Sequence, residues 1–291
     1  MINMPDLVVA CADHVGEGPV WVPEESCLYW IDINGKRLHR YQSDSLAHTT
    51  VATPARVGSF ALRRNGGLVA AMEHDLGWLD PSTGAFERFA SPEADREGNR
   101  YNDGRCDRQG RFFPGSMTLD RSGPKGVLWR LTADGRISEA ASGVTVSNGL
   151  AWSPDGRTMY WSDSPSGRVW RFAYYPDDGI AYDRELWLGP DSAPGRPDGA
   201  ATDADGCYWS ARWQGSRVVR FTPDGRVDRE ILLPVSRITM PAFGGSDLKT
   251  LYITSAREGM TEAEAEAEPL AGALFAVDVG IAGLVEPRFA G

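Results

Sequence analysis

The chain has 291 residues, of which 42% are hydrophobic and 24% are charged, a composition typical of a folded globular protein rather than a disordered one. Forty acidic residues against 30 Lys and Arg give a net charge of −10, and no run of the sequence gathers the positive charges. Binding to nucleic acid or to an anionic membrane is therefore disfavoured. No apolar stretch approaches the roughly 18 residues that a membrane-spanning helix needs.

The N-terminal residues and the cysteines bear on localisation. Residues 1–14 carry two aspartates and no basic residue ahead of a short apolar run, so we expect no secretory signal peptide. The four cysteines lie far apart without any Cys-x-x-Cys pair; they are Cys11, Cys27, Cys106 and Cys207. This spacing predicts neither a zinc ribbon nor a disulfide framework. We expect reduced thiols and a cytoplasmic protein.

A polar turn rich in Gly or Asp, followed by an apolar and aromatic strand, occurs six times along the chain. The predicted strands are 27–31, 67–71, 111–115, 158–162, 207–211 and 250–254. Each is followed by a second segment of hairpin character, at 36–41, 77–80, 126–131, 167–172, 216–221 and 272–277. Equivalent residues from Leu28 to Leu251 are 40 to 49 positions apart, which is the length of a propeller blade.

Six all-β units with no helical period of useful length favour a six-bladed β-propeller, with residues 1–291 as one domain and a site at the central channel. A β-sandwich with many strands is the alternative, but it would not need a repeat near 45 residues. The alternating Glu and Ala residues of segment 261–268 break the pattern. We expect a short exposed helix or loop there, inserted in the last blade, with Thr261 as its N-cap.

The units can be aligned on the glycines of their turns, and the residues eight positions earlier then fall near the end of the innermost strand, facing the channel. These symmetry-related positions hold Glu17, Gly58, Asn102, Asn148, Asp198 and Met240. Four of the six carry side-chain oxygens, and two are carboxylates. Because converging carboxylates repel one another without a cation, and hard divalent ions prefer oxygen ligands, the register predicts a metal site. Ca²⁺, Mg²⁺ or Mn²⁺ is favoured, while Zn²⁺ or Fe²⁺ with waters stays open.

Covalent catalysis by serine or cysteine is disfavoured. The four histidines are scattered, and none stands in a context that would activate Ser147; they are His14, His39, His48 and His74. The segment around Ser147 also lacks the first glycine of a nucleophile elbow.

Five motifs along the chain resemble the SMP-30/gluconolactonase/regucalcin-like family. In order they are Gly16-Glu-Gly-Pro-Val-Trp21; Asn99-Arg-Tyr-Asn-Asp-Gly104 with Asp107; Gly110-Arg111 with Gly115-Ser-Met117; Ser147-Asn-Gly149 with Ser153-Pro-Asp-Gly156; and Pro197-Asp-Gly199. The match runs over essentially the whole chain. It implies a six-bladed propeller that hydrolyses sugar lactones with a divalent metal ion.

The resemblance also implies residue roles. Glu17, Asn148 and Asp198 are expected as metal ligands, and Arg100 and Asn102 as groups that hold the lactone. In many members a glutamate shortly after the Gly-Thr/Ser-Met motif contacts substrate, and here the shorter Asp120 stands at that position. A metal on the lactone carbonyl oxygen acts as Lewis acid, and Asp198 is the candidate general base for the attacking water.

The expected partner is therefore a small-molecule sugar lactone, with neither nucleic acid nor a membrane involved. Two other functions stay open. One is a metal-dependent esterase or phosphotriesterase on the same scaffold. The other is a non-catalytic propeller that binds metal or docks a partner on one face.

Overall fold

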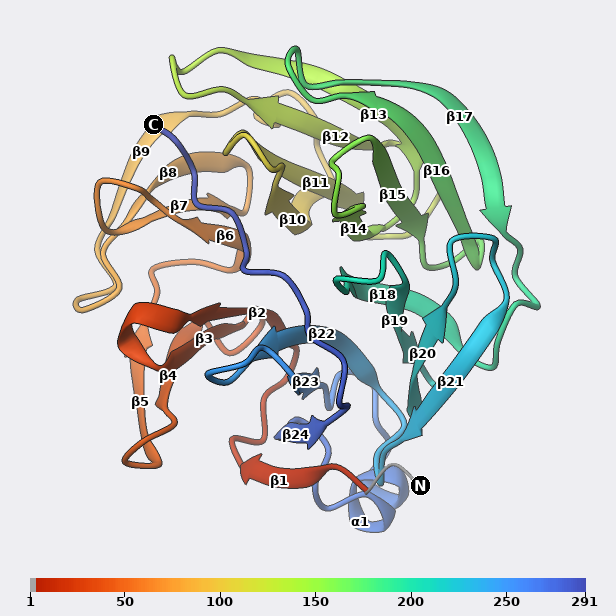
Figure 1. Cartoon of the computed structure of the whole chain (residues 1–291). Helices are drawn as coiled ribbons and strands as arrows, with labels where there is room; N and C mark the ends of the chain where they lie inside the picture. Colours follow the sequence, from red (N-terminus) through yellow and green to blue (C-terminus); the bar gives the residue numbers. More distant parts are fainter. Residues whose placement is uncertain (1–3) are drawn as a thin grey trace.

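The computed structural model describes residues 4–291, which form six four-stranded antiparallel sheets around one central axis (Figure 1). The sheets are the blades of a β-propeller, so the predicted all-β, six-bladed fold is confirmed. The innermost strands form a closed ring, because each contacts the innermost strands of both neighbouring blades. Residues 1–3 lie outside the described residues. They belong to the N-terminal segment in which we expect no signal peptide.

Blades 1 to 3 take their strands in chain order, from the channel outward. Blade 1 contains β2 (Gly16–Val22), β3 (Cys27–Asp32), β4 (Arg37–Gln42) and β5 (Ala47–Ala52), with the 3₁₀ turn Pro23–Glu25 after β2. Blade 2 contains β6 (Val57–Leu62), β7 (Leu68–Met72), β8 (Asp75–Leu79) and β9 (Phe86–Ala90). Blade 3 contains β10 (Asn99–Cys106), β11 (Phe112–Thr118), β12 (Gly126–Leu131) and β13 (Ile137–Val144).

Blades 4 and 5 follow the same rule, and blade 6 adds the first strand of the chain. Blade 4 contains β14 (Ser147–Trp152), β15 (Thr158–Asp163), β16 (Arg168–Tyr175) and β17 (Ile180–Leu188). Blade 5 contains β18 (Arg196–Thr202), β19 (Tyr208–Trp213), β20 (Arg217–Phe221) and β21 (Val227–Leu232). Blade 6 contains β22 (Ile238–Gly244), β23 (Thr250–Ser255), β24 (Leu274–Asp278) and β1 (Asp6–Val9).

Blade 6 closes the ring, since β1 pairs antiparallel with β24 and places Asp6 opposite Ala276. Between β23 and β24 lies the one helix of the described residues, α1 (Glu262–Ala267). Thr261 is its N-cap and forms a capping box with Glu264, which confirms the predicted short exposed helix. Within residues 4–291, no helix is long and apolar enough to cross a bilayer.

The aromatic residues of the repeated pattern pack the blades against one another. Trp30, Trp161 and Trp209 lie on the second strands of three blades and are completely buried. Each indole N–H donates to a side-chain oxygen 2.8–2.9 Å away, which satisfies the polar atom that burial would otherwise leave unpaired. This packing holds the innermost strands in place around the channel.

A β-bulge interrupts the innermost strand at each of the four oxygen-bearing positions. The register shifts fall at Glu17/Val20, Tyr101/Gly104, Asn148/Ala151 and Pro197/Ala200. A bulge redirects a local side chain from the regular alternation, and these four point a polar group into the channel. The four positions lie in the first half of their strands, so the expectation that they lie near the end was wrong. The innermost strand ends a few residues before the turn glycine, so a count of eight residues back from that glycine reaches into the first half of the strand.

The C-terminal residues 279–291 run across one end of the channel, the end that faces the viewer in Figure 1. Their backbone bonds to residues beyond the ends of several innermost strands, including Ala204 N to Ala282 O at 2.9 Å and Ala290 N to Gly110 O at 2.9 Å. Beneath this segment, the buried Arg105 forms an ion pair with Glu286. The segment covers that end of the channel, and the pocket described below opens at the other.

Candidate active site in the central channel

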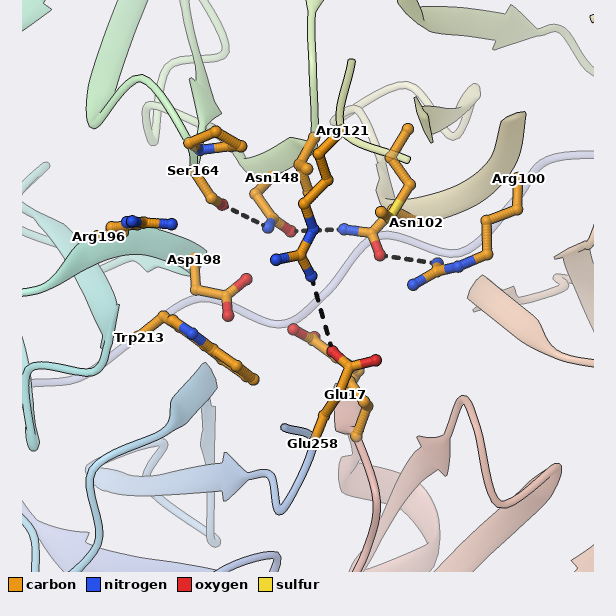
Figure 2. A pocket seen from close by; sticks show the side chains of 14 residues that line it. Glu17, Arg100, Asn102, Arg121, Asn148, Ser164, Arg196, Asp198, Trp213 and Glu258 are labelled. Atoms are coloured by element: carbon orange, nitrogen blue, oxygen red, sulfur yellow. Dashed lines mark hydrogen bonds and ion pairs between the residues drawn. The ribbon is translucent and has the colours of Figure 1, made fainter. Parts of the chain in front are cut away.

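A pocket of about 550 Å³, measured out to its open mouth, lies where the innermost strands begin (Figure 2). It brings together five of the six residues singled out in the sequence; these are Glu17, Arg100, Asn102, Asn148 and Asp198. They come from blades 1, 3, 4 and 5, so residues far apart in the chain share one small volume. The repeat register accounts for this convergence.

Two buried carboxylates face this pocket without a cationic partner among the described residues. Glu17 is 5% exposed and Asp198 is 7% exposed. Glu17 Oε2 accepts a hydrogen bond from the backbone N–H of Gly18 at 2.9 Å. Burial, and after it the charge of Asp103, raises the pKa of Glu17 to about 8. Burial, and after it the charge of Glu17, raises the pKa of Asp198 well above its ordinary value.

Asn148 supplies a third oxygen to this group. Its Nδ2 donates to Ser164 Oγ at 2.8 Å, which fixes the amide and leaves Oδ1 on the side of Asn102, whose Nδ2 donates to it at 3.0 Å. An amide oxygen has two lone pairs, so Oδ1 retains a free one. Across residues 4–291 no group of three or more His, Cys, Asp or Glu is placed to hold a metal ion, so a metal site here would need the amide oxygen as well. Two unpaired carboxylates and an amide oxygen fit a hard divalent ion.

Arg100 and Asn102 form the neighbouring wall of the pocket. Arg100 Nη1 donates to Tyr101 O at 2.7 Å and to Asn102 Oδ1 at 2.9 Å. Burial, and after it the charge of Arg56, lowers the pKa of Arg100 to about 10, so it remains protonated at neutral pH. Hydrogen bonds therefore connect Arg100 through Asn102 to Asn148 (Figure 2). This wall of the pocket therefore presents one charged donor and one amide, both held in place by hydrogen bonds.

Glycines set the direction of two of the site residues. Gly18 and Gly149, which follow Glu17 and Asn148, have φ of 58° and 59°, in the left-handed region. A Cβ on Gly149 would lie 2.4 Å from Tyr208 Oη. Only glycine fits at position 149, which explains the Asn-Gly pair, whereas at Gly18 the positive φ alone favours glycine.

Asp120 is the one predicted site residue that does not line the pocket. It is exposed in the turn after β11, and its Oδ1 accepts a hydrogen bond from Ser122 N at 2.9 Å. The next residue, Arg121, lines the pocket in its place. The contact of Asp120 with substrate stays a prediction, and it requires this turn to rearrange.

Five further polar or aromatic lining residues were not predicted from the sequence; they are Arg121, Ser164, Arg196, Trp213 and Glu258. A signal existed for Arg196, because it stands two positions before Asp198 and alternate residues of a strand share a face. Arg121, Ser164 and Glu258 lie outside the strands, where no periodicity marks them.

Fold and pocket define the chain as a six-bladed propeller with an oxygen-donor site at the mouth of its channel. Residues 15–257 match the family model described as "SMP-30/Gluconolactonase/LRE-like region". The chain belongs to this family, and the predicted resemblance is confirmed.

Two proteins named as lactonases are similar to the chain over nearly its whole length. It is 44% identical over 285 residues to a 6-deoxy-6-sulfogluconolactonase of Pseudomonas putida, covering 98% of each chain. It is 36% identical to a pentonolactonase of Haloferax volcanii, covering 97% of this chain and 96% of the relative. Among solved structures, a calcium-binding protein, regucalcin, from Agrobacterium tumefaciens has a TM-score of 0.94 at 27% identity, with 100% of this chain and 98% of that chain covered.

Proposed function

We propose that the chain, as a single propeller domain, hydrolyses a sugar lactone to the sugar acid with the help of one divalent metal ion. The observation that carries the proposal is the convergence of Glu17, Asn148 and Asp198, from three blades, beside Arg100 and Asn102. The lactonase names of two relatives over nearly the full chain support this reaction.

The roles of the residues follow from their chemistry. Glu17, Asn148 and Asp198 hold the cation, which supplies Lewis-acid polarisation of the lactone carbonyl when bound. Asp198 accepts a proton from the attacking water, whose oxygen bonds to the carbonyl carbon. The ring C–O bond then breaks, and the ring oxygen takes up the proton that Asp198 had accepted, which restores the Asp198 carboxylate. Arg100 and Asn102 orient the sugar through its hydroxyl and carbonyl oxygens.

The ligand set and the cysteines support two finer points. Carboxylate and amide oxygens favour Ca²⁺, Mg²⁺ or Mn²⁺, with Zn²⁺ and Fe²⁺ as the ions to compare. The free state of all four cysteines accords with the proposed cytoplasmic location.

The direct test is hydrolysis of a panel of aldonolactones, aryl esters and phosphotriesters by metal-stripped protein, with each divalent ion added back. We expect aldonolactone hydrolysis above the spontaneous rate that depends on added metal and is lost with chelator. Faster turnover of aryl esters or phosphotriesters would instead identify an esterase or phosphotriesterase. Metal binding without hydrolysis of any compound would identify a non-catalytic propeller and reject the proposal.

The variant Asp198→Asn tests the general base. It keeps the side-chain volume but removes a charge and a basic lone pair, so we expect loss of turnover more severe than in Asn102→Ala. With enough metal to restore occupancy, the rate should stay about 10²–10⁴-fold below wild type. If the rate returns with occupancy, Asp198 is a ligand only. Near-normal activity at ordinary metal concentrations would contradict both roles.

A further inference from the structure

Three guanidinium groups line the pocket of a protein whose net charge is −10. They belong to Arg100 on β10, Arg121 in the loop between β11 and β12, and Arg196 at the start of β18. Arg100 is buried against the pocket wall, whereas Arg121 and Arg196 are exposed at its mouth (Figure 2). The proposed reaction uses Arg100 but leaves the other two without a role.

Arg196 has no partner for its charge within residues 4–291. Its side chain forms neither a hydrogen bond nor an ion pair there, although acidic residues outnumber basic ones in the chain. It lies opposite Trp213 in the pairing of β18 with β19, two positions before Asp198. An unpaired guanidinium at the mouth of a polar pocket is available to a ligand.

Arg121 extends over the pocket from the turn after β11. It has a φ of 53°, in the left-handed region that bulky side chains avoid. Its guanidinium reaches across the mouth to Glu258, with Nη2 3.9 Å from Oε2, and the two side chains are 54% and 38% exposed. An ion pair this long and this exposed contributes little to stability, so a substrate anion can replace Glu258 as the partner of Arg121.

The charges of the lining residues do not balance once the site holds its cation. Three guanidiniums stand against three carboxylates, those of Glu17, Asp198 and Glu258. A divalent ion bound by Glu17 and Asp198 offsets both of their charges. Three guanidiniums then face a single carboxylate, which leaves an excess of positive charge around the substrate.

We propose that Arg121 and Arg196 form a subsite for an anionic group of the substrate, so that the preferred sugar lactone carries a phosphate, sulfonate or carboxylate at the end remote from its carbonyl. This inference rests on the proposed lactonase function and names its substrate class. A guanidinium presents a fork of donors that matches the oxygens of such anions, and it stays charged at neutral pH. Arg100 and the metal ligands hold the ester end, while the two arginines at the mouth hold the charged end.

The test compares kcat/KM for gluconolactone, which is neutral, with kcat/KM for lactones of the same ring that carry a terminal phosphate, sulfonate or carboxylate. We expect wild-type protein to prefer at least one anionic lactone over the neutral one by tenfold or more. Arg121→Gln and Arg196→Gln should each reduce that preference about 10–100-fold, the range of a charge-assisted hydrogen bond. The three anions distinguish which acid group fits.

Two further variants control the experiment. Arg136→Gln removes the same charge at a side chain that is 86% exposed in the turn between β12 and β13, at the other end of blade 3, and should leave the preference unchanged. Glu258→Gln removes the competing carboxylate and should raise the preference by up to about fivefold. Equal use of neutral and anionic lactones, or a preference that both pocket-arginine variants leave intact, would overturn the subsite while leaving the lactonase function in place. Hydrolysis of no lactone at all would reject the lactonase function and this inference with it.

Discussion

Arg100 is 7% exposed, and its guanidinium donates to uncharged oxygens of Tyr101 and Asn102 rather than to a carboxylate. Its charge is therefore available to the substrate, and it does not hold a metal ligand directly. We expect Arg100→Ala to lower kcat/KM for a lactone about 10–100-fold, with metal content unchanged. Elemental analysis beside the kinetics checks both parts. Parallel loss of metal would instead assign Arg100 to structural support of the site.

The raised pKa of Glu17, about 8 in the absence of a cation, predicts how metal binding depends on pH. Below pH 8 the carboxyl group of Glu17 holds a proton that the metal must displace, and the raised pKa of Asp198 acts in the same direction, so the affinity for Mn²⁺ should rise with pH through about 8. Titration calorimetry from pH 6 to 9, in buffers of different ionisation enthalpy, measures the affinity and the released proton. A pH-independent affinity without proton release would contradict the assignment.

The same group has a defined effect on the stability of metal-free protein. A carboxyl pKa raised from 4.5 in the unfolded chain to about 8 in the fold favours the folded state while the group is protonated. This contribution is complete below pH 4.5 and is lost as the pH rises through about 8. With metal bound, which requires the ionised carboxylate, the stability of the protein should instead increase as the pH rises.

The sequence identified five pocket residues that lie on strands, but it missed Arg196 and Trp213, which also lie on strands, and the polar lining residues on loops. Glu17, Asn102, Asn148 and Asp198 could be predicted because a common register around a repeated architecture determines where they point. The loop after β11 has no such register. Its turn exposes Asp120 and sends Arg121, at a φ of 53°, over the pocket, so one step along the chain separates the residue expected there from the one found.

At the level of elements, the bulge after Asn148 depends on a glycine that meets neighbours on several sides. A Cβ on Gly149 would lie 2.4 Å from Tyr208 Oη, 2.7 Å from Ser162 Oγ and 3.0 Å from Asp198 O. We expect Gly149→Ala to lower the free energy of unfolding by about 2–4 kcal/mol, through backbone strain and overpacking. The substitution should also weaken metal binding, since it displaces the strands that carry Asn148 and Asp198.

Gly135 provides the matched control. It also has a positive φ, of 82°, but a Cβ there meets nothing within 4 Å. Gly135→Ala should lower the free energy of unfolding only through backbone strain, by about 1–2 kcal/mol, and should leave metal binding intact. Urea unfolding of both variants separates strain from steric overlap. Equal losses of stability and unchanged metal affinity in both would contradict the role given to the bulge.

Strands were easier to predict than the contacts between them. The repeated turn and aromatic strand placed the second and third strands of every blade, because alternation and turn chemistry are local properties. The bulges of the innermost strands were not predicted, since no local sequence pattern marks where the register of a strand pair shifts. The pairing of β1 with β24 joins the two ends of the chain, and no local pattern reports it.

For the whole molecule, the C-terminal residues stabilise the ring from the side opposite the pocket. Phe289 is 1% exposed and packs in a core cluster with residues of blades 2 and 3. Phe289→Ala should cost about 3–5 kcal/mol of unfolding free energy, because the cavity it leaves lies between blades. Val285→Ala, at a side chain 50% exposed in the same segment, should stay within about 0.5 kcal/mol of wild type. Equal stability of the two variants would show that the segment does not brace the ring.

The central claim is that three blades meet at one divalent metal ion in the pocket that binds the lactone. Anomalous diffraction from crystals grown with Mn²⁺ tests it most directly, using protein shown to hydrolyse a lactone with the same ion. The account predicts one strong peak per chain, within bonding distance of side-chain oxygens of Glu17, Asn148 and Asp198. A peak elsewhere, or one that leaves out two of these three side chains, would contradict it.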